Sequence, residues 1–410
     1  MNWPMVQLQE LARPEKGSIV SGPFGSNIGS RFFVEEGIPV IRGNNLTVGR
    51  EKFIDEGFVF LTEEKATEFK NCEAKKYDII FTAAGTIGQV GLIPENTKFE
   101  KYIISNKQLR VRIDTSKANP VFVYYWLTTR EMNRHIIGLN NGGAVPLINL
   151  SIIRKLPIPL PPYEKQDRIV SIISAYDSLI ENNRRRIQLL EQSARLFYRE
   201  WFVNLRFPGH EHVRIIDGVP ERWRKKKLKE IADVNAISLN NGFQEKIEYI
   251  DISSVTTGQI NETTLYEFKD APGRARRLVR HGDIIWSCVR PNRESHAIIW
   301  NPRKNLIAST GFAVISPIEA PTSYIYQALT TKEFVGYLTN NARGVAYPAV
   351  TGKDVESAEI LIPTNSLLEQ FDGTVKATIE QINLLKMQNN KLKEARDILL
   401  PRLMNGEIAV

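Results

Sequence analysis

The chain has 410 residues and a formal net charge of +8, a size that allows two or three domains and a charge that favours a polyanionic partner. It contains no apolar run long enough for a transmembrane helix, and residues 1–11 lack the basic head and apolar core of a secretion signal. The two cysteines, Cys72 and Cys288, lie far apart in sequence, which excludes a disulfide scaffold and fits a cytoplasmic protein with free thiols.

Residues 1–162 are predicted to form a mixed, mostly β domain. Several short apolar runs are bounded by Gly, Asn and Pro clusters, as strands commonly are; they include 38–41, 78–81 and 109–111. The apolar spacing over residues 121–137 is helical instead. Prolines within residues 157–162 favour an extended stretch, so we expect the domain to end there.

Residues 163–207 are predicted to form one long helix. Its apolar positions are separated by steps that alternate between four and three residues, and they are Ile169, Ile173, Tyr176, Ile180, Asn183, Ile187, Leu190, Ala194, Phe197 and Trp201. This seam is typical of a helix packed lengthwise on another helix. A polar residue such as Asn183 inside the seam fixes the register at some cost in stability.

Residues 208–364 repeat the plan of the first domain. Segment 282–286 echoes 77–81, and 329–331 echoes 127–129. The matched positions are mostly framework positions, and the residues between them differ. A shared framework with different surfaces indicates two related domains with two different ligands.

Residues 365–410 carry a second seam, in which the steps again alternate between three and four residues. Its positions are Leu368, Phe371, Val375, Thr378, Ile382, Leu385, Asn389, Leu392, Arg396, Leu399 and Leu403. We expect the two long helices to pack on each other as an antiparallel coiled coil. The predicted fold class is α+β: two similar mixed α/β domains separated by the helix pair, with a pseudo-twofold internal repeat.

Three aromatic residues near the end of the first helix, Tyr198, Trp201 and Phe202, allow two interpretations. They form an exposed apolar patch that awaits a partner, or they pack on the neighbouring domain.

The chain lacks the sequence motifs of the common catalytic sites. Segment 160–163 superficially resembles the adenine methyltransferase tetrapeptide, but Leu160 stands where that motif has Asn or Asp. No P-loop motif is present, and His210 and His212 have no further Cys or His ligand nearby. We therefore expect no catalytic residue, cofactor or metal site in this chain.

The layout resembles the DNA-specificity subunit of a Type I restriction–modification system over nearly the whole chain. The residues that carry this resemblance are Leu156–Pro162 followed by Glu164–Gln166, the second copy at Ile362–Pro363 with Glu369 and Gln370, Ser21–Asn27, Gly282–Trp286 followed by Arg290–Asn292, and Ser309–Phe312. The second copy departs from the pattern at Thr364 and Asn365, where the prolines are missing.

This resemblance implies a division of labour. Each domain would be a target-recognition domain that binds one half of an asymmetric, bipartite site in double-stranded DNA. The paired helices would space the halves and bind two methyltransferase subunits, which would carry S-adenosylmethionine, and motor-nuclease subunits would join for cleavage. The chain itself would be non-catalytic and cytoplasmic, with no membrane partner.

Base readout requires bidentate Arg, Asn or Gln side chains and small polar groups on loops. The candidates in the first domain are Ser26, Asn27, Arg42, Asn44, Asn45 and Thr86; those in the second are Arg274, Arg290, Asn292, Arg293, Arg343 and Tyr347. The basic runs at 184–186 and 224–227 would contact phosphates, which positions DNA without reading its sequence.

Two other classes of function remain open at this point. The chain could be a structural scaffold that assembles partner proteins through its coiled coil, or an enzyme in its own right. The missing motifs disfavour the enzyme, and the salt dependence of DNA binding separates the scaffold from a DNA reader.

Overall fold

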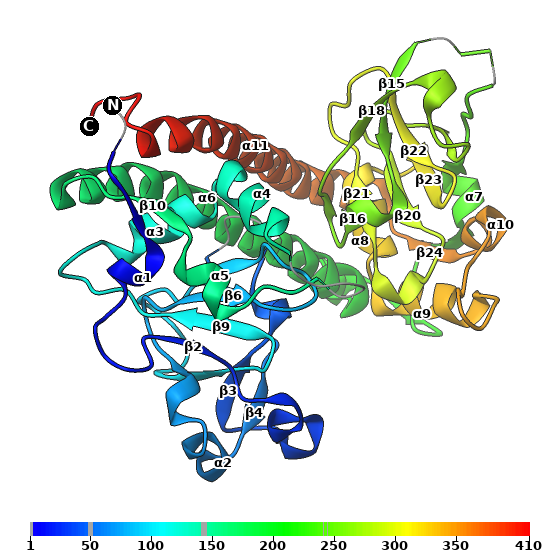
Figure 1. Cartoon of the computed structure of the whole chain (residues 1–410). Coiled ribbons are helices and arrows are strands. Elements are labelled where there is room, and N and C mark those ends of the chain that lie inside the picture. The colour runs from blue at the N-terminus through cyan, green and yellow to red at the C-terminus, as the bar shows by residue number, and fades with distance from the viewer. Residues whose placement is uncertain (1–2, 48–51, 141–145, 241, 244) are drawn as a thin grey trace. The chain divides into compact units, whose positions relative to one another are not determined.

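The computed structural model describes residues 3–47, 52–140, 146–240, 242–243 and 245–410. The chain forms two units, which are described separately: unit 1 comprises residues 1–181 and 389–410, and unit 2 comprises residues 182–388. Each unit contains one α/β domain and a stretch of each of two long helices. The domain of unit 1 is called domain 1, and that of unit 2 domain 2 (Figure 1).

Domain 1 contains two four-stranded sheets. The first, antiparallel, has the order β2 (Ile19–Ser21), β9 (Gln108–Val111), β6 (Ile79–Thr82) and β7 (Val90–Leu92). The second has the order β4 (Val59–Leu61), β3 (Ile38–Ile41), β8 (Tyr102–Ile104) and β5 (Glu73–Ala74). Strands β3 and β8 are parallel. The three apolar runs predicted as strands are thus β3, β6 and β9.

The helical spacing of residues 121–137 corresponds to two helices, α3 (Pro120–Leu127) and α4 (Arg130–Gly138). The chain turns at Thr128, and the Thr129 hydroxyl caps α4 by accepting a hydrogen bond from the Met132 amide (3.3 Å). Domain 1 also contains the short helices α1 (Leu8–Leu11), α2 (Glu63–Thr67) and α5 (Leu150–Arg154), and a ribbon in which β1 (Met5–Gln7) pairs with β10 (Pro157–Pro159). The proline-rich stretch is therefore extended, as predicted.

Domain 2 repeats both sheets of domain 1 in the same strand order. One sheet is β14 (Ala232–Val234), β23 (Phe312–Pro317), β20 (Ile284–Ser287) and β21 (His296–Ile298). The other is β18 (Thr264–Glu267), β15 (Lys246–Ile250), β22 (Leu306–Ser309) and β19 (Ala275–Leu278). Its one parallel pair, β15 with β22, corresponds to β3 with β8. The predicted internal repeat is confirmed.

The ribbon of domain 2 and its helices also follow the plan of domain 1. They are β13 (Arg224–Lys227) paired with β24 (Glu359–Ile362), α7 (Leu228–Ile231), α8 (Thr322–Leu329), α9 (Lys332–Asn341) and α10 (Gly352–Glu356). Domain 2 also contains two short hairpins, β11 (Ile215–Ile216) with β12 (Val219–Pro220), and β16 (Val255–Thr256) with β17 (Gln259–Ile260).

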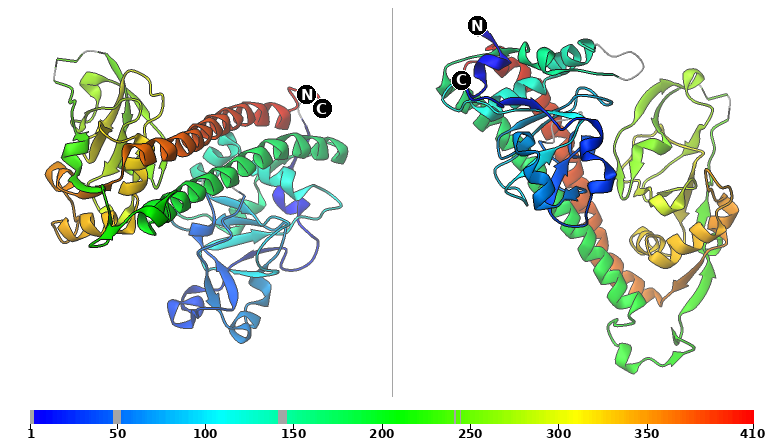
Figure 2. Two further views of the ribbon diagram at one scale, coloured as in Figure 1. Left: turned by 180° about the vertical axis from the view of Figure 1, so that it is seen from behind. Right: turned by 60° about the horizontal axis from the view of Figure 1, so that its bottom comes forward.

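The two predicted long helices are α6 (Tyr163–Tyr198), which continues into a π-helical turn at Arg199–Val203, and α11 (Asn365–Met404). The first was predicted to reach residue 207, but Leu205 has φ +57° and breaks the helical path. Similarly, α11 ends before Gly406, which has φ +70°. Both helices can be followed from two further directions in Figure 2.

The helices pack antiparallel in each unit. In unit 1, Asp177 pairs with Arg396, and the Ile180 carbonyl accepts from the side-chain amide of Asn389 (3.3 Å). In unit 2, Glu191 pairs with Lys386, and Phe197 stacks on Phe371 with centroids 5.3 Å apart. In each unit, residues with higher numbers in α6 contact residues with lower numbers in α11, as antiparallel packing requires. The predicted seam residues are buried or half-buried, including Asn183 and Asn389.

The aromatic end of α6 packs inside unit 2. Tyr198 and Phe202 are 8 % and 5 % exposed, respectively. Tyr198 lies 5.4 Å from Tyr324, and Phe202 lies 5.8 Å from Trp223, between ring centroids. The interpretation of these side chains as an exposed patch was therefore wrong, and packing on the neighbouring domain is what the structure contains. Separately, no helix in the described part of the chain has the length and apolar character needed to cross a bilayer.

Candidate nucleic-acid interface

Four loops of domain 1 converge at one end of its sheets, because β2, β3, β6 and β8 all end there. The Gly22 amide donates to the Gln108 carbonyl (2.9 Å), the Ser105 amide to the Ile41 carbonyl (3.0 Å), and the Ala83 amide to the Lys107 carbonyl (2.7 Å). We call the loops 22–28, 42–46, 83–88 and 105–107 edge 1. All six candidates in domain 1 lie on the first three of these loops.

The approach of the first loop to the fourth depends on a glycine. A Cβ atom at Gly22 would lie 1.9 Å from the carbonyl oxygen of Ser105. No side chain fits at that distance, so the Ser21–Asn27 turn requires glycine at this position. The turn ends in a short 3-10 helix at Gly25–Ile28, and Ile28 is buried in the core of the second sheet.

The two adjacent asparagines of edge 1, Asn44 and Asn45, differ in their exposure to solvent. Asn44 is exposed, as are Ser26, Asn27 and Thr86, and Arg42 is half-buried. Asn45 is fully buried: its side-chain oxygen accepts from the Arg42 amide (2.9 Å), and its Nδ2 donates to the carbonyls of Ile54 (3.1 Å) and Glu56 (2.9 Å). Its polar atoms are thus used inside the domain, where they hold the loop that presents Arg42 and Asn44.

A second side-chain amide, that of the half-buried Gln89, shapes the same loop. Gln89 Nε2 donates to the carbonyls of Gly43 (3.1 Å) and Leu46 (3.0 Å), and its Oε1 accepts from the Thr82 hydroxyl (2.8 Å). Sequence reasoning did not single out Gln89. The only signal in the sequence was a polar amide next to the apolar strand 90–92, and the two loop carbonyls that it binds are more than forty residues away in sequence.

Edge 1 also contains exposed side chains that were not among the candidates. Asn106 and Lys107 form the tip of the fourth loop, and Phe24, beside Ser26, is 91 % exposed. The internal repeat could have pointed to Asn106 and Lys107, because they occupy the place of Thr310 and Gly311 between the corresponding strands of domain 2.

Domain 2 brings its corresponding loops together in the same way. The Cys288 amide donates to the Gly311 carbonyl (2.8 Å), the Thr310 amide to the Arg274 carbonyl (2.8 Å), and the Arg290 amide to the Pro348 carbonyl (2.7 Å). We call residues 251–254, 274, 288–294, 309–311 and 343–349 edge 2. All six candidates in domain 2 lie on it.

Arg290 has the most defined position in edge 2. Its guanidinium carbon lies 4.7 Å from the ring centroid of Tyr347, and its Nη2 donates to the Ala346 carbonyl (3.3 Å). Its backbone is left-handed, with φ +51°, which turns the chain sharply before Pro291. Tyr347 and Val345 are exposed. Stacking and a single backbone contact pre-orient the guanidinium and leave its other N–H groups able to bind a ligand.

Asp251 is an acceptor at edge 2 that sequence reasoning missed. Its carboxylate accepts from the Ser253 hydroxyl (2.6 Å), the Ser253 amide (3.0 Å) and the Tyr249 hydroxyl (3.1 Å). Burial alone would raise the pKa of Asp251, but these hydrogen bonds and the charge of Arg274 outweigh it and leave the pKa below its ordinary value. The side chain is therefore an anion at neutral pH, able to accept from the exocyclic amine of cytosine.

The basic run at Arg224–Lys227 is remote from edge 2. The run forms β13, which lies a few residues before Ala232 in the chain. Ala232 pairs with Pro317, the last residue of β23, whereas edge 2 lies at the other end of that strand, near its first residue, Phe312. Phe312 pairs with Ser287, which leads into edge 2. The prediction that this run contacts phosphates therefore receives no support from its position in the domain.

The two free thiols, Cys72 and Cys288, are half-buried. Burial raises the pKa of the Cys288 thiol to about 11 and also raises that of Cys72, which favours the unreactive thiol form. Among the residues that the structure describes, no group of three or more His, Cys, Asp or Glu side chains is arranged to hold a metal ion. The polar surfaces of the two edges are suited to hydrogen bonding with a ligand.

Comparison with known proteins identifies the class. Residues 2–192 and 220–393 each match the model of the Type I restriction modification DNA specificity domain, so the chain belongs to that family. It is a specificity-subunit chain with two target-recognition domains, each followed by a long helix.

Individual relatives match most of this chain and most of their own length. The MjaIX specificity subunit of Methanocaldococcus jannaschii is 24 % identical over 430 residues, covering 100 % of this chain and 94 % of the relative. The HindI specificity subunit of Haemophilus influenzae is 23 % identical over 404 residues, covering 82 % and 87 %. The crystal structure of the Type I restriction–modification S subunit from M. genitalium has a TM-score of 0.57 at 16 % identity, covering 98 % and 96 %, and it supports the fold.

Proposed function

We propose that this chain is the non-catalytic DNA-reading subunit of a Type I restriction–modification complex. Each target-recognition domain reads one half of an asymmetric, bipartite site in double-stranded DNA. The observation that carries this proposal is that one framework presents two different polar edges. Directly after the parallel strand, domain 1 has Arg42-Gly43-Asn44-Asn45, and domain 2 has Asp251-Ile252-Ser253-Ser254.

The chemistry of the edges favours unlike half-sites. We assign base contacts in domain 1 to Ser26, Asn27, Arg42, Asn44 and Thr86, with Asn106 and Lys107 added. In domain 2 we assign them to Arg274, Arg290, Asn292, Arg293, Arg343 and Tyr347, with Asp251 added. Bidentate Arg favours guanine, Asn favours adenine and a carboxylate accepts from cytosine. Because Arg and Asn stand at different places on the two edges, and edge 2 adds Asp251, the two sets would select different base sequences. Asn45 is left out because its side chain is already bonded within domain 1.

The long helices supply the spacing in this proposal. The proposed divisions are recognition domains at 1–162 and 208–364, and spacer segments at 163–207 and 365–410, whose helical parts end at Val203 and Met404. A helix with the 36 residues of α6 is roughly 54 Å long. A paired rod of this length is stiff enough to fix the gap between half-sites, since changing the gap also rotates one half about the duplex axis.

We propose that outer faces of the helices bind two methyltransferase subunits. Leu189 and Leu196 of α6, seven residues apart on one helical face, are 57 % and 49 % exposed. Leu384 and Met387 of α11, at helical spacing, are 49 % and 57 % exposed. Apolar side chains at such spacing suit docking of partner helices. The partners would bring S-adenosylmethionine, and motor-nuclease subunits would join the complex in the cytoplasm.

The proposal is tested by mapping methylation. The chain is expressed in a host with its methyltransferase subunit, and methylated adenines are located by sequencing with and without the chain's gene. We expect methylation at one gapped motif that disappears without the gene. Methylation that does not depend on the gene, or at an ungapped motif, would contradict the proposal. A scaffold without DNA contacts would also lack the steep salt dependence of binding that phosphate contacts cause.

A further inference from the structure

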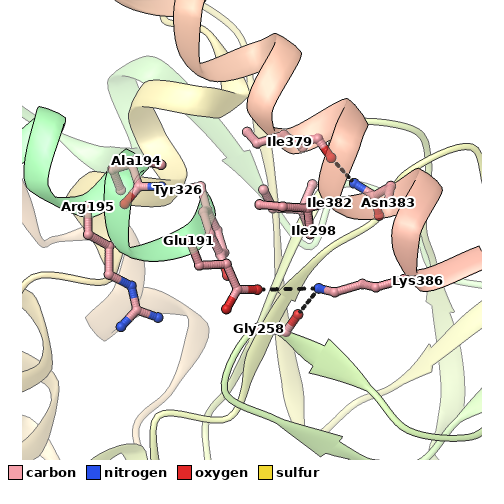
Figure 3. Close-up of a pocket in the computed structure, with 11 residues that line it drawn as sticks. Glu191, Ala194, Arg195, Gly258, Ile298, Tyr326, Ile379, Ile382, Asn383 and Lys386 are labelled. Carbon is pink, nitrogen blue, oxygen red and sulfur yellow. Dashed lines mark hydrogen bonds and ion pairs between the residues drawn. The ribbon is translucent and has the colours of Figure 1, made fainter. Parts of the chain in front are cut away.

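Three parts of unit 2 meet at Lys386 of α11 (Figure 3). The Lys386 Nζ donates to the carbonyl of Gly258 (2.7 Å) in the turn between β16 and β17, and it lies 3.5 Å from Glu191 Oε1 of α6. One lysine thus joins both helices to the hairpin of domain 2. The contact borders a small pocket between them, whose lining also includes Tyr326 and Ile382.

Glycine suits position 258 in the turn that approaches the helices. Gly258 has φ +73°, a left-handed conformation that disfavours other residues. A Cβ atom there would lie 3.3 Å from Glu191 Oε1 and 3.5 Å from the Tyr326 hydroxyl. A larger residue at position 258 would therefore have a strained backbone and a tight contact with Glu191.

Breaking the interactions of Lys386 would be unfavourable in free energy. Burial lowers the pKa of Lys386, and the charge and hydrogen bond of Glu191 partly oppose this. An ammonium in such surroundings needs its partners, because a buried charge or carbonyl left unpaired is unfavourable. Tilting domain 2 on the helices would separate Lys386 from Gly258 and leave both groups without their bond.

The hairpin connects the contact to edge 2 through regular structure. The Gly258 amide donates to the His296 carbonyl (2.8 Å). His296 pairs with Trp286 of β20, and their rings stack with centroids 4.5 Å apart. Strand β20 ends at Ser287, directly before the edge 2 segment that carries Arg290. The orientation of the hairpin is thus tied to the orientation of edge 2.

Unit 1 contains an analogous contact made of other residues. Asp177 of α6 accepts from Arg396 Nη1 of α11 (2.7 Å) and from the Tyr125 hydroxyl of α3 (2.6 Å). Both units therefore combine an acid from α6, a base from α11 and a polar group from their own recognition domain. Because residues at different places in the repeat make the two contacts, they are not copies of one sequence motif.

We propose that Glu191, Gly258 and Lys386 form a clamp that fixes the angle of domain 2 on the paired helices and thereby narrows the range of gaps between half-sites that the protein accepts. The clamp rests on the proposed function above. Lys386 is a positioning residue in this scheme, since its contacts are with Gly258 and Glu191 and not with the residues assigned to DNA.

The test uses the full chain and its methyltransferase subunit, with duplexes that carry the half-sites selected by the wild type. The gap between halves is varied one base pair at a time, and each step turns the second half by roughly 35° about the axis. We expect a one-base-pair change to lower wild-type affinity by at least about tenfold, but that of Lys386→Met by less than about threefold. The base preferences within each half should not change.

Control variants separate the clamp from a general loss of stability. Lys386→Arg keeps a donor and a charge and should keep the sharp gap preference. Lys376→Met removes an exposed lysine from the same helix and should also keep it. Glu191→Gln is a smaller change than Lys386→Met and should also broaden the gap preference. It replaces Lys386→Met in the test if that variant does not fold. Thermal melts identify variants that lose only stability.

The outcomes distinguish this inference from the proposed function. If the wild type selects no gapped site, the proposed function fails. If the wild type selects a gapped site and folded Lys386→Met and Glu191→Gln keep its sharp gap preference, the clamp is overturned and the proposed function stands.

Discussion

The guanidinium carbon of Arg290 lies 4.7 Å from the ring centroid of Tyr347. These two candidates of edge 2 are therefore in contact, although their loops are far apart in sequence. The ring limits the positions that the arginine can take. A pre-oriented guanidinium loses less conformational freedom on binding, which suits bidentate recognition of a guanine edge.

Arg290→Ala is therefore expected to weaken binding to the cognate site by about 1–3 kcal/mol and to relax base preference in the half read by domain 2 alone. Competition binding with single-base variants of both halves measures this. Arg290→Lys keeps the charge but lacks the planar fork, so it should relax the same position. An equal loss of affinity on every sequence would make Arg290 a phosphate contact instead.

Adjacent asparagines in edge 1 should behave differently. Asn45→Ala leaves an amide and two carbonyls of domain 1 without their hydrogen bonds, so we expect local stability to fall by about 1–3 kcal/mol. Hydrogen exchange of peptides covering residues 38–61 measures this loss. Asn44→Ala, the matched control, should change stability by less than about 0.5 kcal/mol but weaken DNA binding. Equal effects of the two variants would contradict the assignment.

The pair of Asp177 and Arg396 should stabilise unit 1. Their side chains are only 15 % and 10 % exposed, and the Tyr125 hydroxyl also donates to Asp177. Arg396→Met removes the closer of two cations beside the carboxylate and leaves Lys52, whose Nζ lies 3.9 Å from Asp177 Oδ2, so we expect the free energy of unfolding to fall by about 1–3 kcal/mol. Urea unfolding of this variant, of Asp177→Asn and of the double variant measures the coupling. Additive losses would show that the pair contributes nothing of its own.

His296 should make unit 2 sensitive to acid. Its ring is buried against Trp286, both ring nitrogens lack a hydrogen-bond partner among the described residues, and burial, with Arg195 and Lys386 nearby, lowers its pKa to about 3. The unfolded chain binds the proton near pH 6.5, so stability is full above that value. Below it, stability falls toward pH 3 by up to about 1.4 kcal/mol per pH unit.

His296→Phe removes this titration while keeping a planar ring on Trp286. We expect the variant to equal or exceed the wild type in stability at pH 5 and to match it closely at pH 7.5. Urea midpoints at the two pH values check the expectation. A wild type and variant with the same pH dependence would show that His296 is not the responsible group.

The helix pair and the repeat were predictable because their signals are periodic and local. The seam positions of α6 and α11 and the strands β3, β6 and β9 follow from patterns within single segments. The breaks were harder to predict: α3 ends at Leu127, and the π-helical turn after α6 ends at Val203, shortly before the left-handed Leu205. The side-chain spacing reveals neither end.

The candidate site was predictable only as a set of loops. Asn44 and Asn45 have the same chemistry, and only the fold determines that one is exposed and the other is bonded to residues 54 and 56. Gln89 and Asp251 were missed because their importance depends on neighbours brought together from distant parts of the chain. The two interpretations of Tyr198 and Phe202 likewise differed only in tertiary packing.

The central claim is that two unlike recognition domains read two parts of one DNA site at a set separation. Selection from a randomised duplex library by the full chain with its methyltransferase subunit tests it most directly. We predict recovery of two different short sequences separated by a gap of one length. Recovery of a single continuous sequence, or of no enriched sequence, would contradict the claim.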